Sequence, residues 1–80
     1  MKFPRNVSAR ELIKSLGKVG YEVTRQKGSH IRLTCTSPKA HHITIPNHDP
    51  IKVGTLSAIL SEVALTRNQS KEELVNQIFG

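Results

Sequence analysis

Apolar residues recur three or four positions apart between residues 12 and 19, which is the spacing of one face of an α-helix. They are Leu12, Ile13, Leu16 and Val19. Ser8 stands before this run, and Glu11 stands three positions after Ser8, which is the spacing of a capping box. We therefore expect a first helix that begins at Ser8 and ends at Gly20, since glycine is common just past a helix end.

Between residues 21 and 45 the spacing changes to alternation of apolar and polar positions, which is typical of β-strands. Three strands are expected, over residues 21–26, 30–35 and 41–45. In the first of them Tyr21 and Val23 share one face, because successive side chains point to opposite sides of a sheet.

The second and third strands each have one apolar and one polar face. The residues expected to face the core are Ile31, Leu33, Cys35, Ile43 and Ile45. Those expected on the open polar face are His30, Arg32, Thr34, His42 and Thr44. Turns are expected at Lys27-Gly28-Ser29 and at Ser37-Pro38-Lys39, because glycine, serine and proline favour tight reversals of the chain.

Two more helices are expected towards the C-terminus. The first starts near Val53, and its apolar stripe consists of Leu56, Ile59, Leu60 and Val63. Asn68-Gln69 interrupts the pattern, and Ser70 with Glu73 then forms a second capping box that opens a terminal helix.

The element order predicts an α+β fold, α-β-β-β-α, with a three-stranded antiparallel sheet and a short C-terminal helix. We expect one domain over residues 1–80, with a core over about 4–65 and an extension with a helix over 66–80. Helices have to cover the apolar face of the sheet, whereas its polar face can meet solvent or RNA.

The charge of the chain narrows the choice of partner. The net charge is +6, and ten of the twelve Lys and Arg residues lie within residues 1–52. A basic balance of this kind favours polyanions, and nucleic acid is the first candidate.

The single cysteine and the hydropathy pattern indicate the compartment. Cys35 has no partner for an internal disulfide, which fits a reducing cytosol. Residues 1–5 lack the apolar stretch of a signal peptide, and no run is long enough to span a membrane. We expect a cytoplasmic protein without membrane contact.

The segment Gly28-Ser29-His30 is the most specific chemical feature of the chain. It places an imidazole, which exchanges protons near neutral pH, next to Arg25, Lys27 and Arg32. These cations can bind a phosphodiester and stabilise the charge that develops on it. Proton transfer by His30 on RNA and a surface histidine that only completes a hairpin are both compatible with this pattern.

Two further groups of residues can contact phosphate. Lys52, Gly54 and Thr55 stand at the start of the expected helix near Val53, where free backbone amides favour an anion. Arg10, Lys14 and Lys18 recur every four residues opposite the apolar stripe of the first helix. Each group also has a plain structural interpretation, as a helix start and as a solvated helix face.

The histidines do not predict a metal site. His41, His42 and His48 have no cysteine or carboxylate at a known ligand spacing, and His41 and His42 point to opposite faces of one strand. We expect no metal and no cofactor. His42 and His48 stay candidates for a second acid or base beside His30.

Taken together, these features resemble the HicA family of mRNA interferase toxins over roughly residues 4–65. The segments that carry the resemblance are the early Pro4-Arg5, residues 16–23, residues 25–30, Ile43-Thr44-Ile45-Pro46, His48, residues 52–56 and Ile59-Leu60. Members of the family often have a second histidine after Gly-Ser-His, where this chain has Ile31.

The resemblance implies a fold like that of double-stranded-RNA-binding domains and metal-independent cleavage of mRNA. It implies that the histidine after Gly-Ser, here His30, is catalytic. The residues that we expect to bind RNA around it are Arg25, Lys27, Gly28, Ser29 and Arg32. The resemblance also implies a partner, a HicB-type antitoxin that covers the active site. Two alternatives stay open: a double-stranded-RNA-binding module that does not cut, and a domain that binds proteins through its acidic C-terminal helix.

Overall fold

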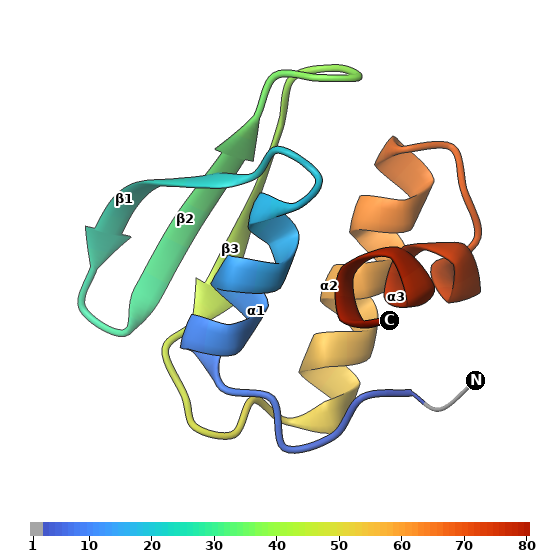
Figure 1. Cartoon of the computed structure of the whole chain (residues 1–80). Helices are drawn as coiled ribbons and strands as arrows, with labels where there is room; N and C mark the ends of the chain where they lie inside the picture. The colour runs from blue at the N-terminus through green and yellow to red at the C-terminus, as the bar shows by residue number, and fades with distance from the viewer. Residues whose placement is uncertain (1–2) are drawn as a thin grey trace.

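Three helices and three strands follow one another in the expected order (Figure 1). The computed structural model describes residues 3–80, so Met1 and Lys2 of the expected domain lie outside the described part. The elements are α1 (Ala9–Gly17), β1 (Glu22–Lys27), β2 (His30–Cys35), β3 (His41–Pro46), α2 (Val53–Thr66) and α3 (Lys71–Phe79). The expected α+β class, α-β-β-β-α with a C-terminal helix, is confirmed.

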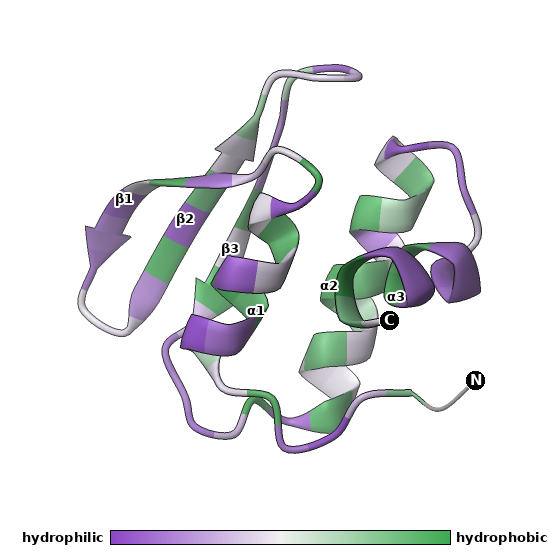
Figure 2. Ribbon diagram, viewed as in Figure 1, coloured by the Kyte–Doolittle hydropathy of each residue, from purple (hydrophilic) through white to green (hydrophobic). Residues whose placement is uncertain are grey.

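The strands form one antiparallel sheet in the order β1-β2-β3. Both α1 and α2 lie on the same side of this sheet, and α3 packs on α2 and also contacts α1 (Figure 1). The helices carry their apolar residues largely along the sides that pack together and on the sheet (Figure 2), and of these residues Val53 and Leu65 of α2 are exposed. One face of the sheet is therefore buried by helices, and the other is open.

Helix α1 begins as expected but ends earlier than Gly20. Ser8 and Glu11 form both hydrogen bonds of the capping box, at 3.1 and 3.2 Å. The helix stops at Gly17, and the chain turns through Gly20, whose φ is +93°. The Tyr21 N–H then donates to the Leu16 carbonyl at 3.2 Å, which satisfies one of the last carbonyls of the helix. Gly20 thus closes the turn after the helix.

Strand β1 is displaced by one residue from the expected range 21–26. Tyr21 precedes the strand and is 2% exposed, whereas Val23 is 47% exposed. Val23 pairs with Leu33 and so shares the apolar face, but it lies on an edge strand whose six residues are all exposed. The helices leave this edge uncovered.

The remaining expectations for the core are confirmed. All five residues expected on the apolar face of β2 and β3 are buried, including Cys35 at 2% exposure. The stripe of α2 is buried too, and α3 contributes Leu74, Val75 and Ile78 to the same apolar cluster. The open side of β2 and β3 carries polar side chains, with Pro46 at the end of β3 as the exception.

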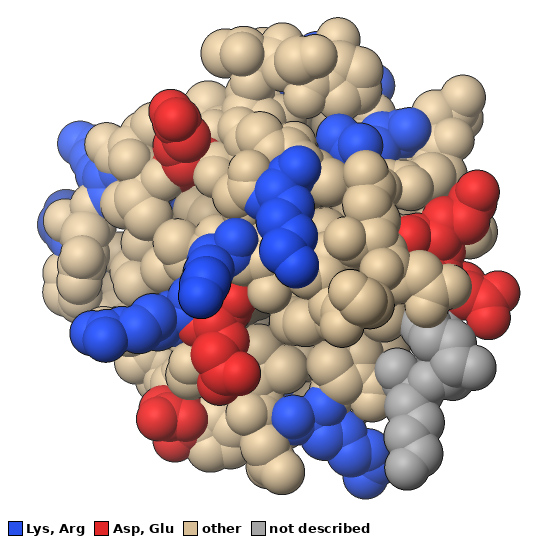
Figure 3. Space-filling view, in the orientation of Figure 1, with Lys and Arg blue, Asp and Glu red and all other residues tan. Residues whose placement is uncertain are grey.

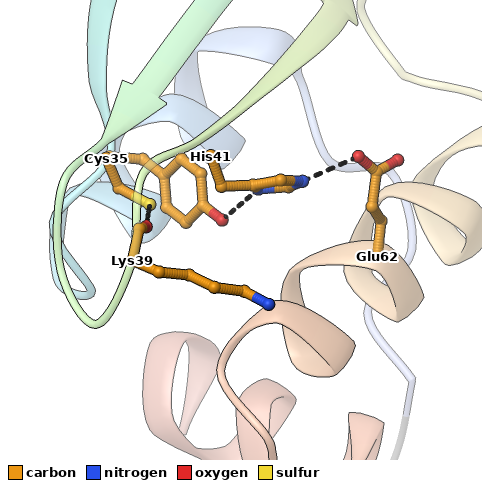
Figure 4. A network of polar contacts seen from close by, with 5 residues as sticks. Cys35, Lys39, His41 and Glu62 are labelled. Atoms are coloured by element: carbon orange, nitrogen blue, oxygen red, sulfur yellow. Dashed lines mark hydrogen bonds and ion pairs between the residues drawn. The ribbon is translucent and has the colours of Figure 1, made fainter.

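A chain of polar contacts links the sheet to α2 (Figure 4). The Nε2 atom of His41 lies 2.9 Å from the Glu62 carboxylate, and its Nδ1 atom lies 2.8 Å from the Tyr21 hydroxyl. A carboxylate only accepts, so in the neutral imidazole Nε2–H donates to Glu62 and the Tyr21 hydroxyl donates to Nδ1. Burial raises the pKa of Tyr21 far above its ordinary value, and the neighbouring Cys35 raises it further.

No helix within residues 3–80 combines the length and the apolar character needed to cross a membrane.

Candidate active site

The turn between β1 and β2 sets the position of His30. Lys27 pairs with His30, so the loop consists of Gly28 and Ser29 only, and Lys27 belongs to the strand rather than to the turn. Gly28 has a φ of +57°, which a two-residue hairpin loop with glycine at its first central position requires. No atom lies within 4 Å of a Cβ built there, so the backbone angle alone demands glycine.

A third segment holds this turn. The Asn47 N–H donates to the Ser29 carbonyl at 2.7 Å. The following residue, His48, accepts at its carbonyl from the Ala9 N–H at 3.0 Å. The loop after β3 thus connects the hairpin turn to the start of α1.

A β-bulge in β1 brings the cations of this strand to the open face. Val23 pairs with Leu33 and Arg25 pairs with Arg32, so Thr24 is an extra residue between the two pairs. Under strict alternation Arg25 and Lys27 would share the apolar face of Val23. The extra residue shifts the alternation, as a bulge does, and both cations lie on the polar face with Arg32.

These side chains surround a shallow hollow of about 270 Å³ on the open face of the sheet. Its lining residues are Arg25, Lys27, His30, Arg32, His42 and Thr44. Three of the six carry a permanent positive charge, and no carboxylate is among them. The structure therefore collects five of the candidate residues that the sequence singled out, two of them histidines, in an anion-attracting site.

The second histidine of the hollow stands at a distance from the first. His30 pairs with Pro46, and His42 lies four residues before Pro46 on β3. At roughly 3.3 Å per residue, the two backbones are about 13 Å apart along the strands. The two imidazoles therefore lie towards opposite ends of the hollow, with Arg32 and Thr44 paired between them.

Other candidate residues lie outside this hollow. His48 lines a separate hollow of about 330 Å³ with Arg10 and Asp49. Lys52, Gly54 and Thr55 lie at the start of α2, where Lys52 is the N-cap and no side chain caps the helix. The backbone amides of this first turn can still receive an anion, but not as part of the hollow around His30.

Metal-binding groups do not gather in the described part of the chain. Within residues 3–80 there is no group of three or more His, Cys, Asp or Glu residues placed to hold a metal ion. Both ring nitrogens of His41 are hydrogen-bonded.

The fold and the hollow define a small basic α+β protein with a histidine among cations on an open sheet. Residues 9–65 match the family described as the HicA toxin of bacterial toxin-antitoxin systems. The match covers more than half of the chain, so the chain belongs to the HicA toxin family. A search of curated proteins found no match, and a search of solved structures found none.

The family match ends at residue 65, within α2. Helix α3 lies wholly beyond it, although its buried residues belong to the common core.

Proposed function

We propose that this toxin is an endoribonuclease that cleaves mRNA in the cytoplasm without a metal ion, with His30 as its catalytic residue. The observation that carries the proposal is the hollow, where His30 stands among Arg25, Lys27 and Arg32 on an open sheet face. Membership of the HicA toxin family supports the role of a toxin.

The proposed reaction is an internal transfer within RNA. His30 removes the proton from a ribose 2′-hydroxyl, whose oxygen then bonds to the adjacent phosphorus. The bond from phosphorus to the 5′-oxygen of the next nucleotide breaks, and that oxygen receives a proton. The products are a 2′,3′-cyclic phosphate and a 5′-hydroxyl end. Proton transfer of this kind accelerates a reaction about 10²–10⁴-fold.

The cations supply the electrostatic part of this mechanism. Arg32 lies at the centre of the hollow, next to Arg25 across the β1–β2 pair and to Thr44 across the β2–β3 pair. Guanidinium groups donate two parallel hydrogen bonds to phosphate oxygens. Arg32 and Arg25 are therefore the proposed ligands of the reacting phosphate, with Lys27 beside His30.

His30 can serve as base for the 2′-hydroxyl, as acid for the leaving oxygen, or as both in turn. His42 lines the same hollow and is for that reason the first candidate for a second proton-transferring group, although its backbone lies about 13 Å from that of His30 along the strands. His48 lies in another hollow. Gly28 and Ser29 shape the turn, and Lys52, Gly54 and Thr55 form a more distant phosphate site.

A HicB-type antitoxin is the proposed protein partner, and it inhibits by covering the hollow. A charge of +6 on the toxin favours an acidic surface on that partner.

The experiment that tests the function incubates the purified protein with a long RNA in excess chelator. We expect cleavage by the parent and, for His30→Ala, a loss of about 10²-fold or more with unchanged circular dichroism. The control is Lys39→Ala, which removes an exposed cation outside the hollow. A shift of the RNA in a gel without cleavage by the parent would instead favour the non-catalytic double-stranded-RNA-binding module. Full activity of folded His30→Ala would remove this residue from the mechanism.

A further inference from the structure

A row of basic side chains crosses the outer face of α1. Arg10, Lys14 and Lys18 are exposed and stand four residues apart, so they lie above one another on the helix. Figure 3 shows this row on the face that carries α1, with an acidic group beside its lower end. The row lies on the opposite side of the molecule from the hollow, because α1 packs on the apolar face of the sheet.

This row is only partly explained by the stability of the fold. Lys18 donates from Nζ to the Ile78 carbonyl at 3.0 Å, and Lys14 lies in the last turn of α1, where a cation is favourable. Like charges four residues apart nevertheless repel each other. Within residues 3–80, Arg10 and Lys14 form no ion pair, and the Glu11 carboxylate between them in sequence accepts from the Ser8 N–H. A bound polyanion would remove the repulsion.

The structure also connects this row to the hollow around the edge of the molecule. Asn47 binds the turn that carries His30, and His48 binds the first N–H of α1. The polar hollow of about 330 Å³ at this place is lined by Asn47, His48 and Arg10 together. Asp49 also lines this hollow, and its negative charge repels phosphate. Phosphates are therefore favoured on the side of the hollow where Arg10 lies.

We propose that single-stranded RNA leaves the His30 hollow over the Ser29–His48 edge and continues along α1, where Arg10 and Lys14 bind its phosphates. We call Ser29, Asn47, His48, Arg10 and Lys14 the edge track. This proposal rests on the proposed function for the occupant of the hollow. It adds a second binding surface, which favours long RNA over short RNA and reads no base sequence.

The test compares the parent with Arg10→Gln/Lys14→Gln and with a control, Arg5→Gln/Lys39→Gln. The control removes the same charge from two exposed residues outside the edge track. The binding probe is a 2′-O-methylated single strand of about 20 nucleotides, which spans several phosphate contacts and cannot be cleaved by a 2′-hydroxyl. The cleavage substrates are unmodified RNAs of about 20 and about 4 nucleotides.

For Arg10→Gln/Lys14→Gln we expect the slope of log K against log salt to become shallower by about 1.4, since each single-strand phosphate contributes about 0.7. Over a tenfold rise in salt, the affinity of the parent for the long probe therefore falls roughly 25-fold more than the affinity of the double variant. The control keeps the parent's slope. Cleavage of the short RNA stays at the parent's rate, whereas kcat/KM for the long RNA falls.

The proposed edge track is wrong if the double variant and the control have the same salt slope. The basic row on α1 would then be a surface for an acidic protein and not for RNA. It is also wrong if cleavage of the short and the long RNA falls equally, because Arg10 and Lys14 would then act at the hollow or on the fold. A parent that cleaves neither RNA refutes the proposed function, while the binding slopes still decide on the edge track.

Discussion

At the scale of single residues, the protonation of His30 is the step that pH can reveal. A reaction that needs the neutral form of His30 as a base should accelerate as the pH rises. If His30 acts first as an acid, kcat/KM should fall instead. The measurement is kcat/KM on a long RNA at constant ionic strength, with single-turnover rates to show that chemistry is limiting. A flat profile would contradict proton transfer by an imidazole.

A bell-shaped profile would require a second titrating group, and the geometry ranks the candidates. His42 lines the hollow with His30, whereas His48 lies in a different one. We expect His42→Ala to remove one limb of the bell and His48→Ala to leave both limbs in place. The opposite result would identify His48, which lies outside the hollow, as the second proton-transferring group.

The residues of the site were predictable to different degrees. Gly28-Ser29-His30 is a local pattern, and the sequence alone places its histidine on the open face of β2. The position of Arg25 and Lys27 was not derivable from alternation, since both share the odd-numbered positions of Tyr21 and Val23. Strict alternation would place apolar and basic side chains on the same face of β1. This mismatch was the signal in the sequence that pointed to a bulge at Thr24. The contact of His41 with Tyr21 and Glu62 joins three distant segments and leaves no local signal.

At the scale of elements, the capping box of α3 is a source of acid sensitivity. The Ser70 N–H donates to the Glu73 carboxylate at 2.8 Å, and the Glu73 N–H donates to the Ser70 hydroxyl at 3.0 Å. Hydrogen bonding to Ser70 holds the pKa of Glu73 below its ordinary value. A carboxyl whose pKa is lower in the folded state stabilises that state above its unfolded pKa. The stabilisation is lost as the pH falls through the folded pKa. We expect α3 to loosen in this acid range, and Glu73→Gln to remove that part of the pH dependence.

The same box gives a test at neutral pH. Replacing an N-cap serine by alanine costs about 1 kcal/mol, which lowers the Tm of a domain of this size by roughly 4–8 °C. Ser70→Ala should show this shift, and Ser8→Ala is the matched variant in the capping box of α1. Thermal melts followed by circular dichroism measure both. An unchanged Tm for Ser70→Ala would mean that burial of Leu74, Val75 and Ile78 alone holds α3.

Element types followed from the sequence because periodicity and capping boxes are local. The boundaries differ from the expected ones where tertiary contacts decide them. Helix α1 ended three residues before Gly20, because the chain needs the turn through Gly20 to bring Tyr21 under the sheet. The separation of Lys52, Gly54 and Thr55 from the hollow depends on how α2 packs, which no local pattern specifies.

At the scale of the whole molecule, the open face of the sheet and the outer face of α1 lie on opposite sides, and an antitoxin bound to the first leaves the second free. A HicB-type partner on the hollow should slow amide hydrogen exchange in the turn Gly28-Ser29 and along β1, and leave the outer face of α1 unprotected. The comparison is between free and bound toxin, with cleavage assayed in parallel. Protection confined to α3, with cleavage blocked, would mean that the partner inhibits at a distance.

The contact of Tyr21 with His41 has a spectroscopic consequence. The chain contains one tyrosine and no tryptophan, so the near-ultraviolet absorption of tyrosine reports on this junction alone. Because burial raises the pKa of Tyr21 above its ordinary value of 10.0, the folded protein keeps the phenol neutral at a pH where an unfolded chain would form phenolate. Stability is therefore retained below about pH 10 and declines above it, as the unfolded state releases the proton. The phenolate band is thus an intrinsic optical signal for opening of the junction between sheet and helices, without any introduced dye.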